Sequence, residues 1–254
     1  MKRTLATLVL ASAALFITAS IKYKTAIAQG KASKENFSTK ATKYPTMMDM
    51  TFPEFEAASK KTDVMLLPIG AIEEHGSHLP LGTDAVEATA QVFYVQKYLR
   101  TVGRVKTIVG PPLNIGITNE ASDRARDGTY MYPGSLTVGK ETFVALYLDV
   151  LRSLHDNGMN RVFLYSGHLG GRHLEAIAQI VEEANKKIDG MKVYALIESE
   201  RLEQMKLKPS INILPIEKGQ NFEMLTALLG RGKDQAFSTH GDGTETSLML
   251  YFDP

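Results

Sequence analysis

Four short apolar runs divide the chain, and stretches with helical spacing lie between them. The runs are residues 64–69, 105–109, 162–165 and 192–197. Their brevity and their Val, Ile and Leu content are typical of strands that are buried on both faces of a sheet. Apolar residues recur at helical spacing over residues 84–99, 141–154 and 174–184. Strands that alternate with helices predict an α/β fold, in which helices cover both faces of a mostly parallel sheet.

The first 28 residues have the pattern of a secretory signal peptide. A positive start, residues 1–3, precedes the apolar stretch 5–21, and Ala26-Ile27-Ala28 fits a small-x-small cleavage site. We therefore expect export, to the periplasm or out of the cell, with a flexible lead-in at 29–45 and one domain at 46–254. The alternative is an uncleaved membrane anchor, since 5–21 has about the minimum length of a span but is rich in Ala, Ser and Thr.

Composition excludes several classes of site and partner. The sequence has no cysteine, so a metal would have to be held by nitrogen and oxygen ligands. Four of the 29 Lys and Arg residues lie in the signal segment, which leaves 25 against 28 Asp and Glu, a formal charge of about −3. No long basic run remains, so we expect no nucleic-acid partner.

The residues that could carry chemistry follow the predicted strands. Glu73 and His75 come just after the first strand, and two residues apart in extended backbone they point to the same side. Asp84 begins the next helix, and His168 follows the third strand. Glu245 lies in a glycine-rich turn. In parallel α/β sheets, functional residues usually lie in the loops at the carboxyl ends of the strands. This mixture of carboxylate and imidazole side chains suits Zn, Mn or Fe.

Structural roles for these polar residues are equally open from the residues alone. A Glu-x-His pair in a loop is common, and the glycines around His168 could simply begin a helix. We interpret His78 as a structural residue, His155 as a partner for its helix dipole, and His173 as a residue on a helix surface. Thr83 can cap the helix that begins at Asp84.

Three separated blocks resemble the creatininase (creatinine amidohydrolase) family. Residues 68–84, PIGAIEEHGSHLPLGTD, resemble its P-x-G-x-x-E-x-H-G-x-H-L-P-L-x-T-D block. Residues 165–171, YSGHLGG, resemble its G-H-G-G-N block, and residues 240–247, HGDGTETS, resemble its H-A-G-x-x-E-T-S block. The resemblance extends over about residues 64–250.

The resemblance implies a three-layer α/β/α fold and a hydrolase with two divalent metal ions, usually oligomeric. Glu73 and His168 would hold one ion and His75 the other, with Asp84 between them. In creatininase itself a glutamate two places after the equivalent of His168 completes the second metal. Gly170 stands there in this chain, so Glu245 is the candidate to replace that ligand.

The resemblance also implies the catalytic residues and the reaction. His240 would act as acid or base beside the ions, and Glu245 shares the catalytic assignment. The expected function is hydrolysis of a non-peptide C–N bond in a small amide or cyclic amide. Creatininase surrounds its flat substrate with tryptophans, and this sequence has none, so we expect a substrate other than creatinine.

Two further hypotheses remain open. One is an exported protein that keeps the fold and binds a metal or ligand without catalysis, because Leu169 and Gly171 depart from the family's second block. The other is a hydrolase of a formamide or of a peptide end, which would use the same ions with a different pocket.

Overall fold

A computed structural model describes residues 47–101, 104–119, 131–216, 245–246 and 249. Its centre is a five-stranded sheet in the order β2-β1-β3-β4-β5, and every neighbouring pair is parallel. The strands are β1 (Val64–Ile69), β2 (Ile108–Val109), β3 (Arg161–Ser166), β4 (Lys192–Glu198) and β5 (Ile213–Ile216). All six residues of β1 are buried, as expected for an inner strand covered on both faces.

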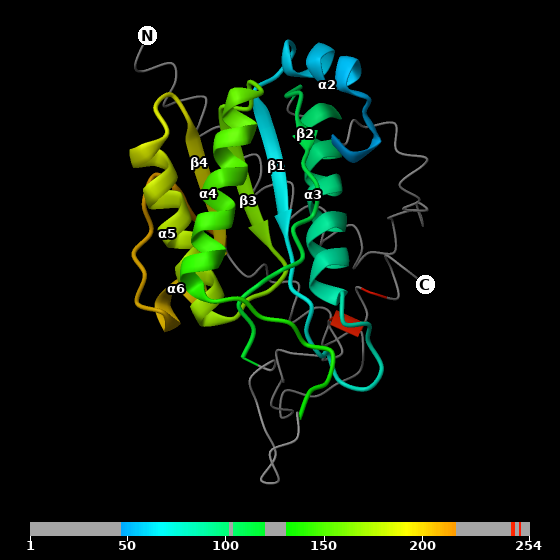
Figure 1. The fold of residues 1–254 in the computed structure, drawn as a ribbon, viewed down its shortest axis with the longest axis vertical. Helices are drawn as coiled ribbons and strands as arrows, with labels where there is room; N and C mark the ends of the chain where they lie inside the picture. The colour runs from blue at the N-terminus through cyan, green and yellow to red at the C-terminus, as the bar shows by residue number, and fades with distance from the viewer. Residues whose placement is uncertain (1–46, 102–103, 120–130, 217–244, 247–248, 250–254) are drawn as a thin grey trace.

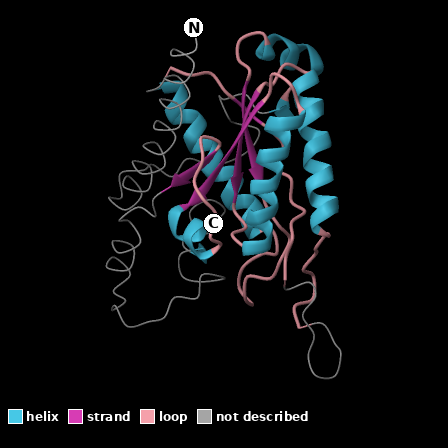
Figure 2. Ribbon diagram, turned by 90° about the vertical axis from the view of Figure 1, so that its left-hand side faces the viewer, coloured by secondary structure: helices cyan, strands magenta, loops and turns pink. Residues whose placement is uncertain are grey.

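Helices lie on both faces of the sheet, which confirms the three-layer α/β fold (Figure 1). The helix α3 (Thr83–Thr101) packs on one face through Val92, Val95 and Leu99. The helices α4 (Lys140–Asp156) and α5 (Gly171–Lys187) pack on the other face, and Figure 2 shows the sheet between these layers. Alternate residues of β1 therefore serve two separate apolar clusters, with Leu66 in one and Met65 in the other.

Shorter helices complete the described part of the chain. They are the 3-10 turn η2 (Met47–Asp49), α2 (Phe52–Ser59) and α6 (Ser199–Gln204). None of the helices in this part is long and apolar enough to cross a bilayer. The predicted signal peptide (1–28) and the lead-in (29–45) lie outside the described residues, so both stay predictions.

The predicted strands and helices are present in the structure, with some differences. Only residues 108–109 of the run 105–109 form a strand, and β5 and the short helices α2 and α6 were not predicted. The prediction that Thr83 caps α3 is wrong. The helix already includes Thr83, whose hydroxyl donates to the Pro80 carbonyl at 2.7 Å, while the Gly82 carbonyl accepts the first helical bonds from Ala85 and Val86.

The register of β1 and β3 decides where their loops meet. Ile69 lies beside Ser166, so both strands end at the same level of the sheet. The amide of Gly167 donates to the Ile69 carbonyl at 2.9 Å and continues the pairing by one residue. Residues that follow the two strands are thus brought together at the carboxyl edge, although they are almost a hundred positions apart in the sequence.

Candidate metal centre

Two glycines allow the start of α3 to touch the ends of β1 and β3. A Cβ atom on Gly70 would lie 2.7 Å from the Ala85 Cα, and one on Gly167 would overlap the Asp84 carbonyl oxygen. Both obstacles are backbone atoms, which cannot move aside as a flexible side chain could. The glycines therefore permit the close approach that places Asp84 among the residues after the two strands.

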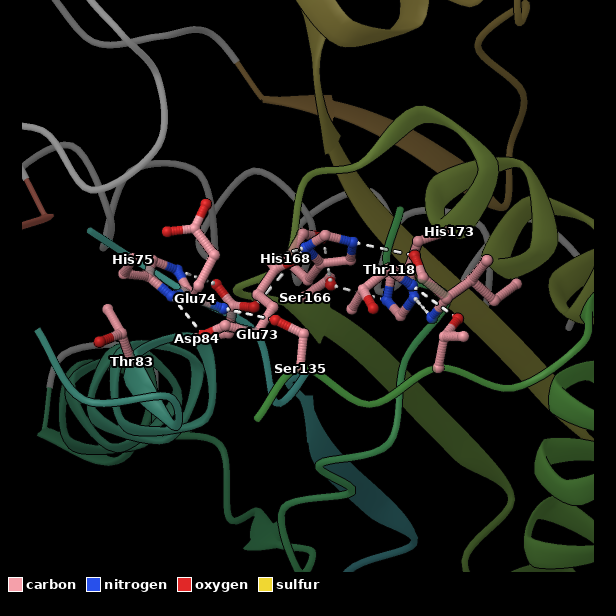
Figure 3. A network of polar contacts seen from close by, with 12 residues as sticks. Glu73, Glu74, His75, Thr83, Asp84, Thr118, Ser135, Ser166, His168 and His173 are labelled. Atoms are coloured by element: carbon pink, nitrogen blue, oxygen red, sulfur yellow. Dashed lines mark hydrogen bonds and ion pairs between the residues drawn. The ribbon is translucent and has the colours of Figure 1, made fainter. Parts of the chain in front are cut away.

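Glu73, His75 and Asp84 form a buried cluster. Their potential ligand atoms all lie within 4.8 Å of one another, and the exposed fractions of the three residues are 0%, 0% and 3%. His75 Nδ1 lies 3.1 Å from the Glu73 carbonyl oxygen, so it donates, and its Nε2 lies 3.2 Å from Asp84 Oδ1. The neighbouring Glu74 carboxylate points away from this cluster in Figure 3.

His168 joins the cluster from the end of β3. Its Nδ1 lies 2.5 Å from Glu73 Oε1 and 3.6 Å from Asp84 Oδ2. Its Nε2 lies 3.1 Å from the Ile117 carbonyl oxygen and must donate to it. The two oxygens of Asp84 therefore face two different imidazoles, His75 on one side and His168 on the other (Figure 3).

The carboxylates of the cluster favour a positive charge on His75. Burial opposes a charge on His75, but the hydrogen bond and charge of Asp84, the Glu73 carbonyl and the charge of Glu245 outweigh it and raise its pKa to about 9. Asp84 Oδ2 is buried and accepts no hydrogen bond within the described residues. Buried carboxylates are costly unless a cation or donors compensate them. Two carboxylates and two imidazoles are a donor set that fits Zn, Mn or Fe.

The third sequence block is described only at Glu245, Thr246 and Met249. Thr246 is attached to the first block, because its hydroxyl lies 2.8 Å from His78 Nε2. Glu245 is half-buried and acts electrostatically on His75. It is not one of the three residues that form the cluster. His240 lies outside the described residues, so its acid–base role stays a prediction.

The prediction for His173 is wrong, because this residue is fully buried and not on a helix surface. Its ring packs 4.8 Å from the rings of Phe143 and His168. Burial and the nearby His168 hold the pKa of His173 well below its usual value, so it is neutral. The sequence did contain a signal: His173, Ile177 and Ile180 follow the i, i+4, i+7 spacing of one helix face.

The structure thus brings four of the predicted ligands together: Glu73, His75, Asp84 and His168. Their role as ligands stays a prediction, which the geometry supports. A family model for creatininase, described as creatinine amidohydrolase, matches residues 48–254. This chain belongs to the creatininase family.

Curated relatives of this creatininase-family chain have more than one activity. It is 31% identical over 121 residues to creatinine amidohydrolase from Pseudomonas putida, covering 47% of this chain and 43% of the relative. It is 30% identical over 118 residues to a mycofactocin precursor peptide peptidase from Mycolicibacterium smegmatis, covering 46% and 43%. The matched segment thus spans less than half the length of each relative.

Solved structures agree on the fold. A crystal structure of creatinine amidohydrolase has a TM-score of 0.54 at 23% identity, covering 82% of this chain and 72% of that chain. A structure named creatininase Mn has a TM-score of 0.55 at 23% identity with the same coverage. A creatininase variant of Zn-Zn type has a TM-score of 0.54 at 22% identity, again with that coverage. At these identities the likeness shows the fold alone.

Proposed function

We propose that this protein is a metal-dependent hydrolase that cleaves the C–N bond of an amide. The observation that carries the proposal is the buried cluster of Glu73, His75 and Asp84, whose ligand atoms lie within 4.8 Å of one another. His168 adds a second imidazole at 2.5 Å from Glu73. An ordinary structural network would place hydrogen-bond donors on every buried carboxylate oxygen, whereas Asp84 Oδ2 accepts none among the described residues.

The residues divide into groups with different tasks. Glu73 and His168 would hold one divalent ion and His75 the other, with Asp84 shared and Glu245 the candidate to complete the second set. Divalent ions in such sites activate water as a nucleophile and polarise a carbonyl oxygen. The orientation of the Asp84 carboxylate supports sharing, since each of its oxygens faces a different imidazole. Relatives of known structure that are named for Mn and for Zn-Zn also support a metal site.

For the substrate, we favour a small amide or a cyclic amide with a non-peptide C–N bond. The match to creatinine amidohydrolase supports this class. The sequence has no tryptophan to enclose a flat ring, which argues against creatinine itself. A second candidate is cleavage at a peptide end, and its support is the match to the mycofactocin precursor peptide peptidase.

We further propose where the protein acts and what it binds. The signal-like pattern of residues 1–28 supports export to the periplasm or the exterior. We propose a homo-oligomer with a small-molecule amide as its substrate, and no nucleic-acid or membrane partner once the signal is removed.

Purified protein loaded with Zn²⁺ or Mn²⁺ can be tested against small lactams, formamides and short peptides. Turnover of a lactam or formamide that is abolished by a chelator and restored by metal would support the first candidate. Turnover of peptides alone would support the second. Failure to bind any divalent ion under every loading condition would refute the metal-dependent mechanism.

A further inference from the structure

Two hydrogen-bonded arms connect His173 on α5 to His168. On the first arm, the Ile117 amide donates to His173 Nδ1 at 3.2 Å, and the Ile117 carbonyl accepts from His168 Nε2 at 3.1 Å. On the second arm, Ser166 Oγ lies 3.2 Å from His173 Nε2 and donates to the His168 carbonyl at 2.7 Å. One arm therefore reaches the imidazole of His168, and the other reaches its backbone (Figure 3).

The direction of every hydrogen bond in this circuit follows from its partners. A backbone amide can only donate, so His173 Nδ1 is an acceptor and its proton lies on Nε2. The Ser166 hydroxyl gives its single proton to the His168 carbonyl, so the Ser166 oxygen must accept from His173 Nε2. Both arms thus require the same tautomer of His173, although each arm contacts a different nitrogen of its ring.

These hydrogen bonds fix which ring nitrogen of His168 faces the carboxylates. Its Nε2 carries a proton for the Ile117 carbonyl, which leaves Nδ1 as the nitrogen that faces Glu73 and Asp84. All members of the circuit are buried: His173 is 0% exposed, Ile117 3%, His168 7% and Ser166 8%. Histidine ligands commonly need such a partner on the second ring nitrogen to fix their orientation.

We propose that His173 is a positioning residue, which acts through Ile117 and Ser166 to present Nδ1 of His168 to the metal centre. This rests on the proposed metal-dependent function, and it goes beyond the ligands by assigning a task to a histidine that touches none of the reacting atoms. Gly116 leaves space for the ring of His173. A Cβ at this position would lie 3.2 Å from His173 Nδ1, so only a glycine leaves the ring undisturbed.

The test is the affinity for Zn²⁺ alone, measured by competition with a chromophoric chelator. His173→Phe keeps a ring in the site but breaks both arms, and we expect it to weaken Zn²⁺ binding by about ten- to a hundredfold. Ser166→Ala breaks one arm, and we expect about a tenfold loss. Because both residues belong to one circuit, the double variant should lose no more than His173→Phe alone.

Asn185→Ala is the matched control, because Asn185 lies on the same helix and makes partly buried hydrogen bonds to the backbone of Val181 and Val193. It should lower stability and leave Zn²⁺ affinity within twofold. Nitrogen-15 NMR of the Zn²⁺-bound protein should show coordination through Nδ1 of His168 and a retained proton on Nε2. If His173→Phe does not fold, Ser166→Ala and the NMR spectrum still decide the question.

The outcomes distinguish failure of the proposed function from failure of the positioning role. Wild-type protein that binds no Zn²⁺ refutes the proposed function itself. Wild-type binding with no loss in Ser166→Ala and His173→Phe overturns the positioning role and leaves the proposed function standing. Losses that multiply in the double variant, or Zn²⁺ on Nε2 of His168, would also overturn it.

Discussion

The strands β1 and β3 carry charged residues at both of their ends, and the two ends differ in kind. At the amino end, Asp63 and Arg161 form a bidentate ion pair, with both oxygens 3.0 Å from the Arg161 Nε. Their side chains are 36% and 33% exposed, so water and salt screen the pair. At the carboxyl end, Glu73, Asp84 and two histidines are buried. The comparison shows that one pair of neighbouring strands can hold a partly exposed structural ion pair at one edge and a buried cluster of carboxylates and imidazoles at the other.

The largest effect is expected from Asp84→Asn, which tests whether the carboxyl end is a metal centre. An amide cannot serve two cations as a carboxylate does, so Zn²⁺ binding and hydrolysis should fall below detection. In calorimetry, Zn²⁺ at a hundred times its dissociation constant should stabilise the wild type by about 2.7 kcal/mol and the variant by about zero. The control Asp149→Asn changes an exposed residue of α4 and should keep the full metal-dependent stabilisation. If Zn²⁺ stabilised Asp84→Asn as much as the wild type, the carboxyl end of the strands would be a structural contact like the amino end.

The second prediction concerns the close contact that assembles the carboxyl end. Gly167→Ala should cost about 2–3 kcal/mol of unfolding free energy, because the new Cβ meets the backbone oxygen of Asp84. Gly82→Ala is the control, since nothing lies within 4 Å of a Cβ there, and we expect a loss of at most about 1 kcal/mol. Urea denaturation monitored by circular dichroism gives both values, and equal losses would contradict the contact.

A smaller effect separates two adjacent glycines. A Cβ on Gly170 would lie 2.6 Å from His168 Nε2, while one on Gly171 has only Met205 Cγ at 4.0 Å. Gly170→Ala should therefore turn the His168 ring away from Ile117 and weaken Zn²⁺ binding about tenfold, with little change in stability. Gly171→Ala should bind Zn²⁺ like the wild type. Equal affinities for the two variants would remove the steric role of Gly170.

The smallest effect is expected at the amino end. Asp63→Asn should lower the unfolding free energy by less than about 1 kcal/mol, because the pair with Arg161 is partly exposed. The difference in unfolding free energy between the variant and the wild type should shrink in 1 M NaCl, because the screening length there is only roughly 3 Å. Zn²⁺ affinity should not change. A loss of metal binding in Asp63→Asn would show that the two ends of the strands are coupled.

Local pattern was enough to predict β1, β3 and β4 and the three long helices, because their apolar runs and spacings are properties of short segments. It was not enough for β5, a four-residue edge strand that contains Pro215 and pairs with β4 alone in the described sheet. The start of α3 was misplaced by one residue, because Thr83 lies inside the helix and its hydroxyl donates to the Pro80 carbonyl instead of capping the helix.

The sequence by itself determined the kinds of ligand atom in the candidate site and their place after strands, since parallel strands end at one edge of a sheet. Which atoms meet there was decided by tertiary structure alone. The register of Ile69 with Ser166 and the close approach of Gly167 to the Asp84 carbonyl both depend on residues distant in the chain. Steric exclusion and the satisfaction of buried hydrogen bonds act between such residues, and no local pattern contains them.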